Sequence, residues 1–543
     1  MPNGLFKLPE VKNEPILTYL PGSKEKLALK ESIKVAKSQE LEIYSVINGN
    51  EVKTGDRKRI HPPHEINHTL GHYYKCGPKE VEMAIEAALA AKPSWESMDW
   101  QDRAAIFLKA ADLMAGPYRS QMSTATMLGQ SKNVYQAEID CICELVDFLR
   151  FNVHFMSEIY KNQPYSPAQT WNKVEYRALE GFVFALTPFN FTAIAGNLPT
   201  APAMMGNTVV WKPSETQIYS AHLLMKIFQE AGLPDGVINL VYVGGADAGK
   251  VIFSHPAFAG IHYTGSTEVF QQIWKTIGDH IHTYHSYPRI VGETGGKDYV
   301  VAHPSADPKA VAVGLTRGAF EFQGQKCSAA SRAYIPQSLW PEVLKYMKED
   351  LAKCKMGTVE DFTNFINAVI DEKSFDKIMN YISNAKNDPS VEIVIGGKGD
   401  KTQGYFIEPT VILTKDPYYK TMCEEIFGPV LTIFVYQDQD FFDTLEILNK
   451  TSPYALTGAL FAKDRNVIVK ASEILRHTAG NFYINDKPTG AVVHQQPFGG
   501  GRASGTNDKA GSSLNLMRWI SARTMKENFV SPTDFSYPFM LES

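Results

Sequence analysis

Short apolar runs alternate with segments of helical periodicity through the middle of the chain. The apolar runs are residues 182–186, 208–211, 240–243, 260–263 and 288–292. Apolar residues recur at helical spacing between them, at residues 218–231, 246–254 and 268–277. Short apolar runs bounded by turn residues are typical of buried parallel strands, and strands that alternate with helices build βαβ units. The pattern therefore predicts an α/β fold with a doubly wound parallel sheet.

The N-terminal third has a different pattern. Residues up to about 77 are polar and look irregular. Helical spacing begins near residue 81, where Pro78 suits the first turn, and it returns at residues 103–114 and 135–160. Glu144 lies on the last of these helices, where an acidic side chain most often faces solvent.

A second α/β unit is expected further along, with helices at residues 341–355 and 440–449. Pro, Ser and Asn break the helical pattern after residue 164, and the alternation that follows is that of a hairpin reaching out of the domain. Aromatic residues nearly alternate from residue 528 to the end of the chain. An exposed apolar edge promotes association, so we expect this tail to pair with a neighbouring subunit.

Polar residues follow the predicted strands at their carboxyl ends. Asn190 follows the first strand, Lys212 and Glu215 follow the second, and Glu293 follows the fifth. Ligands bind parallel sheets at these ends, so the coincidence of four polar residues there predicts a binding site.

The turn of Gly265 and Ser266 follows the fourth strand and opens a helix. Free N–H groups and the helix dipole at this position favour a phosphate, and a plain helix cap is equally consistent with the two residues. The GxGxxG fingerprint of many dinucleotide-binding sheets is missing from the sequence.

One cysteine lies in a setting that suits a nucleophile. Cys327 stands between a glycine-bearing turn and a run of small residues that begins a new element. The thiolate is the reactive form of cysteine, and the adjacent cation Lys326 would favour it. A cysteine taken alone is more often a small buried hydrophobe, so the case for this one depends on its neighbours.

Composition narrows the class of protein. A chain of 543 residues is too long for one hydrophobic core, so two or three domains are expected. The net charge of -5 provides no basic surface for nucleic acid. The six cysteines form no CxxC pair and no cluster with zinc spacing, so we expect neither disulfides nor a metal. We also expect no membrane span, and we expect a targeting peptide to be absent or already removed, since suitable apolar or basic segments are missing.

Seven motifs in one order resemble the aldehyde dehydrogenase superfamily. They are TPFNF (187–191), WKPS (211–214), YTGS (263–266), ETGGK (293–297), GQKC (324–327), EEIFGP (424–429) and PFGG (497–500). The segments GETGGK (292–297), NFYIND (481–486) and GTND (505–508) are most similar to members that oxidise glutamate γ-semialdehyde. The resemblance implies NAD-dependent oxidation of L-glutamate γ-semialdehyde, formed from Δ1-pyrroline-5-carboxylate, to L-glutamate in proline catabolism.

The resemblance also implies catalytic roles for three residues. Cys327 would attack the aldehyde to give a thiohemiacetal and then a thioester. The Asn190 amide and the Cys327 N–H would stabilise the oxyanion, and Glu293 would activate the water that hydrolyses the thioester. The alternative for Glu293 is an ion pair with Lys297.

The resemblance further implies the ligand contacts. Those to the cofactor NAD are Thr187, Lys212, Glu215, Gly265, Ser266, Glu425 and Phe427. An acidic residue near the ribose would repel a 2′-phosphate, which favours NAD over NADP. Those to the substrate are Glu144, Phe191, Lys326, Ser328, Gly490, Ala491 and Phe498. In this scheme the backbone at residues 490–491 holds the α-carboxylate, and the two phenyl rings enclose the aliphatic part.

The architecture implied is aldehyde-dehydrogenase-like: a Rossmann-type NAD-binding domain, an α/β catalytic domain and a small β oligomerisation element. We expect these at residues 1–163 with 181–301, at 302–510, and at 164–180 with 511–543. The expected assembly is a homodimer or larger homo-oligomer in the mitochondrial matrix that acts on a small-molecule substrate. Two alternatives stay open, namely another semialdehyde or aldehyde dehydrogenase of the superfamily and a catalytically silent NAD-binding structural protein.

Overall fold

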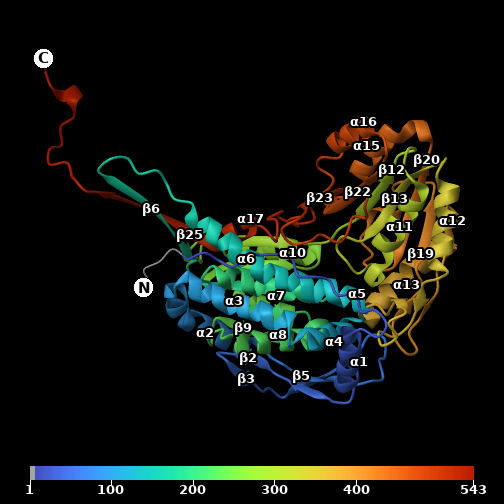
Figure 1. Cartoon of the computed structure of the whole chain (residues 1–543), viewed down its shortest axis with the longest axis horizontal. Coiled ribbons are helices and arrows are strands. Elements are labelled where there is room, and N and C mark those ends of the chain that lie inside the picture. Colours follow the sequence, from blue (N-terminus) through green and yellow to red (C-terminus); the bar gives the residue numbers. More distant parts are fainter. Residues whose placement is uncertain (1–5, 543) are drawn as a thin grey trace.

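The computed structural model describes residues 6–542 and contains two seven-stranded sheets (Figure 1). The first sheet has the strand order β11-β10-β7-β8-β9-β2-β3. Its members are β11 (Arg289–Glu293), β10 (Phe258–Thr264), β7 (Phe182–Thr187), β8 (Thr208–Pro213), β9 (Ile238–Leu240), β2 (Ser45–Ile47) and β3 (Asn50–Val52). The first five are parallel, and the last two are antiparallel additions at one edge. The predicted doubly wound parallel sheet is confirmed.

Helices cover both faces of the first sheet because alternate side chains of its strands point to opposite sides. Phe182 and Phe184 of β7 pack with α2 (Pro78–Ser97), α9 (Gly245–Ile252) and α10 (Thr267–Asp279). Val183 and Ala185 face the other layer. That layer consists of α3 (Trp100–Ala115), α4 (Arg119–Gln130), α6 (Glu144–Lys161), α7 (Thr192–Met204) and α8 (Ile218–Ala231).

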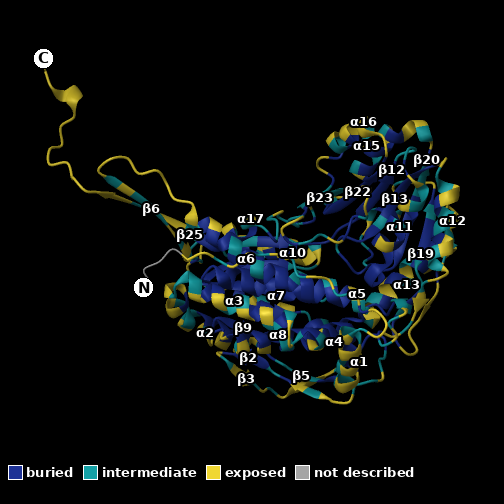
Figure 2. Ribbon diagram, viewed as in Figure 1, coloured by how far each residue is buried: buried dark blue, intermediate teal, exposed yellow. Residues whose placement is uncertain are grey.

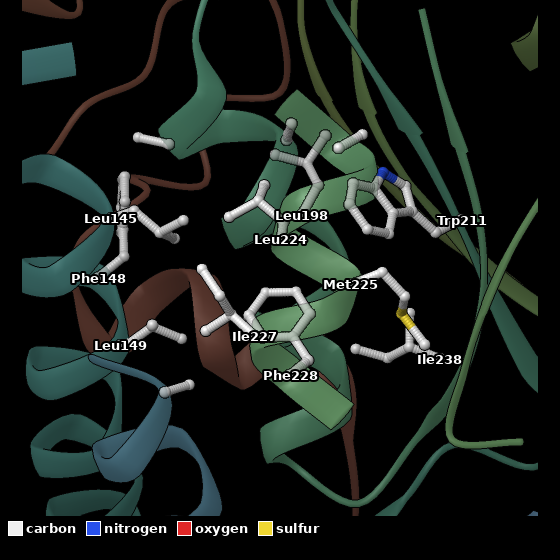
Figure 3. Close-up of a cluster of buried hydrophobic side chains, with 14 of the residues drawn as sticks. Leu145, Phe148, Leu149, Leu198, Trp211, Leu224, Met225, Ile227, Phe228 and Ile238 are labelled. Atoms are coloured by element: carbon white, nitrogen blue, oxygen red, sulfur yellow. The ribbon is translucent and has the colours of Figure 1, made fainter. Parts of the chain in front are cut away.

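The core beneath this second layer is the larger of the two on the first sheet. Figure 3 shows how Leu145, Phe148 and Leu149 of α6 approach Ile227 and Phe228 of α8, with Trp211 of β8 and Ile238 of β9 closing the cluster on the sheet side. These side chains are buried and interdigitate, so the helices that border the site have a fixed position on the sheet.

The second sheet has the order β16-β19-β20-β13-β12-β22-β23. Its members are β16 (Val391–Ile395), β19 (Thr410–Thr414), β20 (Val430–Tyr436), β13 (Ala330–Pro336), β12 (Asp298–Ala302), β22 (Thr457–Phe461) and β23 (Asn481–Ile484). Only β16 is antiparallel. Helices α11 (Pro308–Phe320), α12 (Trp340–Leu351), α13 (Glu372–Asn387), α15 (Phe441–Thr451) and α16 (Arg465–Ile474) accompany it. The two helices expected here are confirmed, and the sheet begins at Asp298, ahead of the expected boundary after residue 301.

The expectation that residues up to 77 are irregular is wrong. This region contains α1 (Lys24–Lys37), β1 (Leu41–Ile43), β4 (Asp56–Ile60) and β5 (Gly71–Lys75) besides β2 and β3. Four of the five residues of β4 are exposed, so the strand carries no apolar period for a sequence to display. The expected helix at 135–160 is present as α5 (Val134–Ala137), a π-helical turn at Glu138–Cys143, and α6.

A two-stranded ribbon projects from the body (Figures 1 and 2). It consists of β6 (Thr170–Ala178) and β25 (Ile520–Asn528), which pair antiparallel along their full length. The expected local hairpin is therefore wrong, because the partner of β6 comes from the C-terminal region of the same chain. Figure 2 shows that the tail after β25 is exposed, and up to residue 542 it contains a 3-10 turn at Pro538–Met540.

Smaller elements complete the fold. They are β14 (Lys355–Met356), β15 (Asn364–Ile366), β17 (Gly399–Asp400), β18 (Phe406–Ile407), β21 (Tyr454–Ala455), β24 (Gly501–Arg502), α14 (Lys420–Cys423) and α17 (Ser513–Leu516). Within residues 6–542, each helix is too short or too polar to cross a bilayer.

Candidate active site

Cys327 lies after a tight loop that follows α11. Phe322, Gln323 and Gly324 are consecutive residues in the left-handed region, with φ of 48°, 55° and 66°. Only glycine adopts this conformation without cost, so the loop needs external support. The Gln323 side chain supplies it by donating to the carbonyls of Ser131 (3.1 Å) and Ala368 (2.8 Å). It also accepts from the Asn367 N–H at 3.1 Å.

Two pockets meet at Cys327. The α6-side pocket lies between α6, α7 and the loop 489–498, and the α10-side pocket lies at the carboxyl ends of β7, β8 and β10. Cys327 and Thr264 line both. A cysteine at such a junction can contact one molecule on each side, so the geometry suits a reaction between two bound partners.

All seven residues expected to contact the substrate line the α6-side pocket, namely Glu144, Phe191, Lys326, Ser328, Gly490, Ala491 and Phe498. Glu293 lines it as well. Six of the residues expected at the cofactor line the α10-side pocket, namely Thr187, Lys212, Gly265, Ser266, Glu425 and Phe427.

Glu215 is the exception. It is exposed and forms an ion pair with Lys75 of β5 at 3.5 Å, outside the residues that line the α10-side pocket. The sequence does not reveal this partner, because β5 lies in the region where no regular structure is expected. Glu215 therefore does not line the α10-side pocket in the described structure. It acts on that pocket only through its electrostatic effect on Lys212, which does line it.

Asn190 is buried in the turn after β7 and reaches across to the nucleophile loop. Its amide nitrogen donates to the Gln325 carbonyl at 3.1 Å, which leaves the second amide hydrogen available. Within residues 6–542, the Cys327 N–H has no hydrogen-bond acceptor. Two free donors thus lie near the sulfur, as an oxyanion site requires.

Glu293 ends β11, and its carboxylate accepts the Gly500 N–H at 3.3 Å. Burial raises the pKa of Glu293 well above its ordinary value. The alternative ion pair with Lys297 is wrong, since none joins the two residues among those described. Lys297 is instead enclosed in the second unit, where burial and the nearby Arg332 lower its pKa to about 7.

The expectation that Lys326 favours the thiolate is wrong for this state of the protein. Lys326 is buried and pairs with Asp140 (3.4 Å) and Glu321 (3.8 Å), so its charge is already balanced. Burial, followed by the charges of Asp298 and Glu293, raises the pKa of the Cys327 thiol well above its ordinary value. Burial and these charges therefore both disfavour the thiolate.

Buried charges form one wall of the α6-side pocket. Asp140 bonds to Lys132 at 2.9 Å and to Lys326 at 3.4 Å, while Lys132 lies 4.2 Å from the centre of the Phe191 ring. Burial and the neighbouring Asp140 raise the pKa of Glu144 to about 8. The expectation that Glu144 faces solvent is thus wrong, and its place in the pocket agrees with the role implied by the resemblance.

Asp140 was missed by the sequence reasoning, although a signal for it exists. It lies four residues before Glu144, and side chains at that spacing share one face of a helix.

The loop opposite α6 carries Thr489, Gly490 and Ala491. Gly490 has φ of 98°, which a side chain would strain, and Ser328 donates to the Thr489 hydroxyl at 3.1 Å. This contact ties the loop to the residue directly after the nucleophile.

The α10-side pocket has the chemistry of a nucleotide site. Ser266 caps α10 by accepting the Val269 N–H at 3.3 Å, so the plain cap is present, and it leaves other N–H groups of the first turn free. Burial lowers the pKa of Lys212. Glu425 accepts the Gly296 N–H at 2.8 Å.

Comparison with known proteins agrees with this geometry. Residues 52–525 match the aldehyde dehydrogenase family. The chain is 51% identical to the mitochondrial delta-1-pyrroline-5-carboxylate dehydrogenase of Dictyostelium discoideum, over 98% of this chain and 96% of that protein. It is 45% identical to the mitochondrial enzyme of that name from Homo sapiens, over 98% and 94%.

Solved structures give the same result. The crystal structure of the delta-pyrroline-5-carboxylate dehydrogenase from Mycobacterium tuberculosis bound with NAD superposes with a TM-score of 0.96. It is 48% identical and covers 99% of this chain and 100% of that one. By sequence and by fold, this chain belongs to the aldehyde dehydrogenase family.

Proposed function

We propose that the chain oxidises L-glutamate γ-semialdehyde, formed from Δ1-pyrroline-5-carboxylate, to L-glutamate with NAD+ in proline catabolism. Relatives that carry the name delta-1-pyrroline-5-carboxylate dehydrogenase match nearly the whole chain and support this assignment. The observation that carries it is the convergence of Cys327, Asn190 and Glu293, from two different sheets, at the junction of two pockets. In this proposal the unit built on the first sheet binds the cofactor, and the unit built on the second sheet, which begins at Asp298, supplies the nucleophile.

The α10-side pocket fits NAD in its donor set. The free N–H groups at the start of α10 suit the pyrophosphate, and Gly265 lets it approach the backbone. Lys212 and Glu425 would hold the riboses, with Thr187, Ser266 and Phe427 completing the wall. When bound, NAD+ accepts a hydride from the carbon held on the cysteine.

The chemistry begins at the Cys327 sulfur. Its thiol loses a proton to water, the sulfur attacks the aldehyde carbon, and the resulting alkoxide accepts hydrogen bonds from the Asn190 amide and the Cys327 N–H. Donors placed for a developing oxyanion contribute about 3 kcal/mol each in related sites. Loss of a hydride from this thiohemiacetal leaves a thioester on Cys327.

Glu293 completes the cycle by taking a proton from water, which attacks the thioester carbon and releases the acid and the thiol. A pKa raised above the ordinary value of a carboxyl makes Glu293 a stronger base for this step. The Gly500 N–H fixes the carboxylate on the side of the α6-side pocket.

The α6-side pocket suits a substrate with an amino acid end. Backbone N–H groups of Gly490 and Ala491, together with Ser328, would bind the α-carboxylate. Glu144 would border the substrate entrance, and Lys326 lines the same pocket while it is paired with Asp140. Phe191 and Phe498 would enclose the aliphatic carbons.

We extend the proposal to assembly and location. The projecting ribbon and the exposed aromatic side chains of Phe529, Phe535 and Phe539 support a homodimer or larger homo-oligomer. The mitochondrial relatives from Dictyostelium discoideum and Homo sapiens support a mitochondrial location.

Steady-state kinetics test the proposal. NADH formation is measured with Δ1-pyrroline-5-carboxylate, with succinic semialdehyde and with simple aliphatic aldehydes, using NAD+ and NADP+, for the wild type and Cys327→Ala. The proposal predicts the highest kcat/KM for the first substrate with NAD+ and no turnover by the variant. A higher kcat/KM for an aldehyde without the amino acid end assigns the chain to another aldehyde dehydrogenase. NAD+ binding without any turnover would indicate a silent protein.

A further inference from the structure

An extended segment near the N-terminus runs along α6. Residues 6–11 lie beside the end of the helix at residues 154–161. Asn13 and Glu14 then contact Asp147, and Leu17 and Tyr19 contact Glu138 in the π-helical turn before α6. We call residues 13–19 the N-terminal strap; Figure 1 shows this part of the chain crossing in front of the helical layer.

Asn13 forms three hydrogen bonds that join two walls of the α6-side pocket. Its amide nitrogen donates to the Asp147 carboxylate of α6 at 2.7 Å and to the Val493 carbonyl at 3.0 Å. Its amide oxygen accepts from the Gln495 side chain at 3.0 Å. One side chain thus bridges the helix and the loop opposite it.

Both walls carry residues that line the α6-side pocket. Glu144 and Phe148 come from α6, and Gly490 and Ala491 come from the loop. An outer pocket shares Glu144, Gly490 and Ala491 with the inner one, and Asn13 and Glu14 line its rim. The strap therefore lies at the mouth of the α6-side pocket.

The strap itself is held firmly. Glu14 pairs with Arg119 and with Arg150, each at 2.7 Å, and its N–H donates to Asp147 at 2.7 Å. The Tyr19 hydroxyl donates to Glu138 at 2.7 Å. These contacts fix the position of Asn13 relative to α6. The hydrogen bonds that join Asn13 to Val493 and Gln495 can therefore fix the position of the loop as well.

A second contact joins α6 to the loop opposite it, and its position shows what Asn13 adds. The His494 ring stacks on Phe151 of α6 with centroids 4.8 Å apart. This stack fixes the outer end of the loop, whereas Asn13 holds Val493 and Gln495 on both sides of it. Removing Asn13 would let the loop rotate about the stack, and that rotation would move the backbone at Gly490 and Ala491.

We propose that Asn13 of the N-terminal strap is a positioning residue that sets the distance between the loop 489–496 and α6, and thereby the affinity for the amino acid end of the substrate. Residue 13 lies before residues 52–525, the region that matches the aldehyde dehydrogenase family. The inference rests on the proposed function, since it concerns the site for that substrate.

The test compares Asn13→Ala with Lys12→Ala, the exposed neighbour that pairs only with Glu10. The proposal predicts that Asn13→Ala raises KM for Δ1-pyrroline-5-carboxylate about fivefold to tenfold, the scale of one or two hydrogen bonds. It also predicts unchanged kcat per active site and unchanged KM for NAD+. Lys12→Ala should match the wild type, and Gln495→Ala, which removes one of the three bonds, should raise the same KM by a smaller factor.

Two outcomes overturn the inference. One is an unchanged substrate KM in Asn13→Ala. The other is an equal rise in the KM for Δ1-pyrroline-5-carboxylate and in the KM for NAD+, together with a loss of kcat and thermal stability, which is the result of a purely structural role. The two proposals are tested by different proteins. The proposed function fails if the wild type does not turn over the substrate, whereas the inference about Asn13 fails only if the variants behave differently from these predictions.

Discussion

The amide nitrogen of Asn190 lies 3.1 Å from the carbonyl oxygen of Gln325, two residues before Cys327. Asn190 follows a strand of the first sheet, whereas Gln325 belongs to the loop that precedes the second sheet's strand β13. The hydrogen bond fixes the amide plane and leaves the second amide hydrogen without an acceptor among residues 6–542, in the pocket that Cys327 also lines. Each of the two sheets thereby contributes one half of the proposed oxyanion site.

Asn190→Ala should reduce kcat by about a hundredfold to a thousandfold, as loss of one oxyanion donor does in other enzymes. NAD+ binding should stay unchanged, because the substitution leaves the α10-side pocket lined by its other residues. Single-turnover NADH formation and NAD+ titration by fluorescence measure the two quantities. A fall of less than about fivefold would remove Asn190 from the oxyanion site.

Gln323→Ala tests the support of the nucleophile loop. The change removes three hydrogen bonds and leaves the buried Asn367 N–H without a partner. The same three bonds stabilise the left-handed backbone conformation of residue 323, which has a φ of 55°. We expect a loss of about 2–4 kcal/mol in the free energy of unfolding, measured by chemical denaturation. Gln323→Glu keeps the acceptor but turns a buried carboxylate toward two carbonyl oxygens, so it should be at least as unstable as Gln323→Ala. Equal stability of all three proteins would contradict this account of the loop.

The raised pKa of Cys327 predicts slow alkylation at neutral pH. A thiol whose pKa lies above its ordinary value of about 8.5 has less thiolate at pH 7, so its rate rises only at higher pH. Iodoacetamide labelling is followed by peptide mass spectrometry between pH 6 and 10, and Cys327→Ala reports the other five cysteines. A rate that is already maximal at pH 7 would show that the thiol is ionised in the free protein.

The first sheet was predictable because its strands are buried on both faces. Such strands have continuous apolar runs, and the runs at residues 182–186 and 208–211 correspond to β7 and β8. The N-terminal strands were not predictable, since β4 is exposed along most of its length and its pairing with β5 depends on backbone bonds. The β6–β25 ribbon joins residues more than 340 positions apart, as Arg177 and Ser521 show, so no local pattern could reveal it.

The residues of the candidate site that lie at the carboxyl ends of strands were predictable from the sequence. Asn190, Lys212 and Glu293 end parallel strands, and such ends meet at one edge of the sheet. The orientation of the Lys326 side chain was not predictable. It is set by an ion pair with Asp140, which lies in a helical segment far away along the chain. The thiolate expectation failed for that reason, and the burial that raises the pKa of Cys327 is equally invisible in the sequence.

His222 predicts how the fold responds to acid. It is buried in α8, and burial lowers its pKa from 6.5 to about 4. Between pH 6.5 and pH 4, His222 is protonated in the unfolded chain and stays neutral in the folded chain. The free energy of unfolding therefore falls as the pH drops through this window. The loss from this residue amounts to about 3 kcal/mol.

Chemical denaturation at pH 7 and at pH 4 of the wild type and His222→Gln measures this effect. The variant should lose less stability than the wild type between the two pH values, because glutamine takes up no proton. An identical loss in both proteins would show that His222 does not contribute to acid sensitivity.

The most direct test of the reaction scheme is to trap the thioester in Glu293→Gln, which keeps the size of the side chain and removes the base. With NAD+ and Δ1-pyrroline-5-carboxylate, this variant should form about one equivalent of NADH per active site in a burst and then stop, as expected when only the hydrolysis step is blocked. Peptide mass spectrometry of the quenched protein should find a glutamyl group on Cys327. A burst without that adduct, or an adduct on another cysteine, would contradict the account.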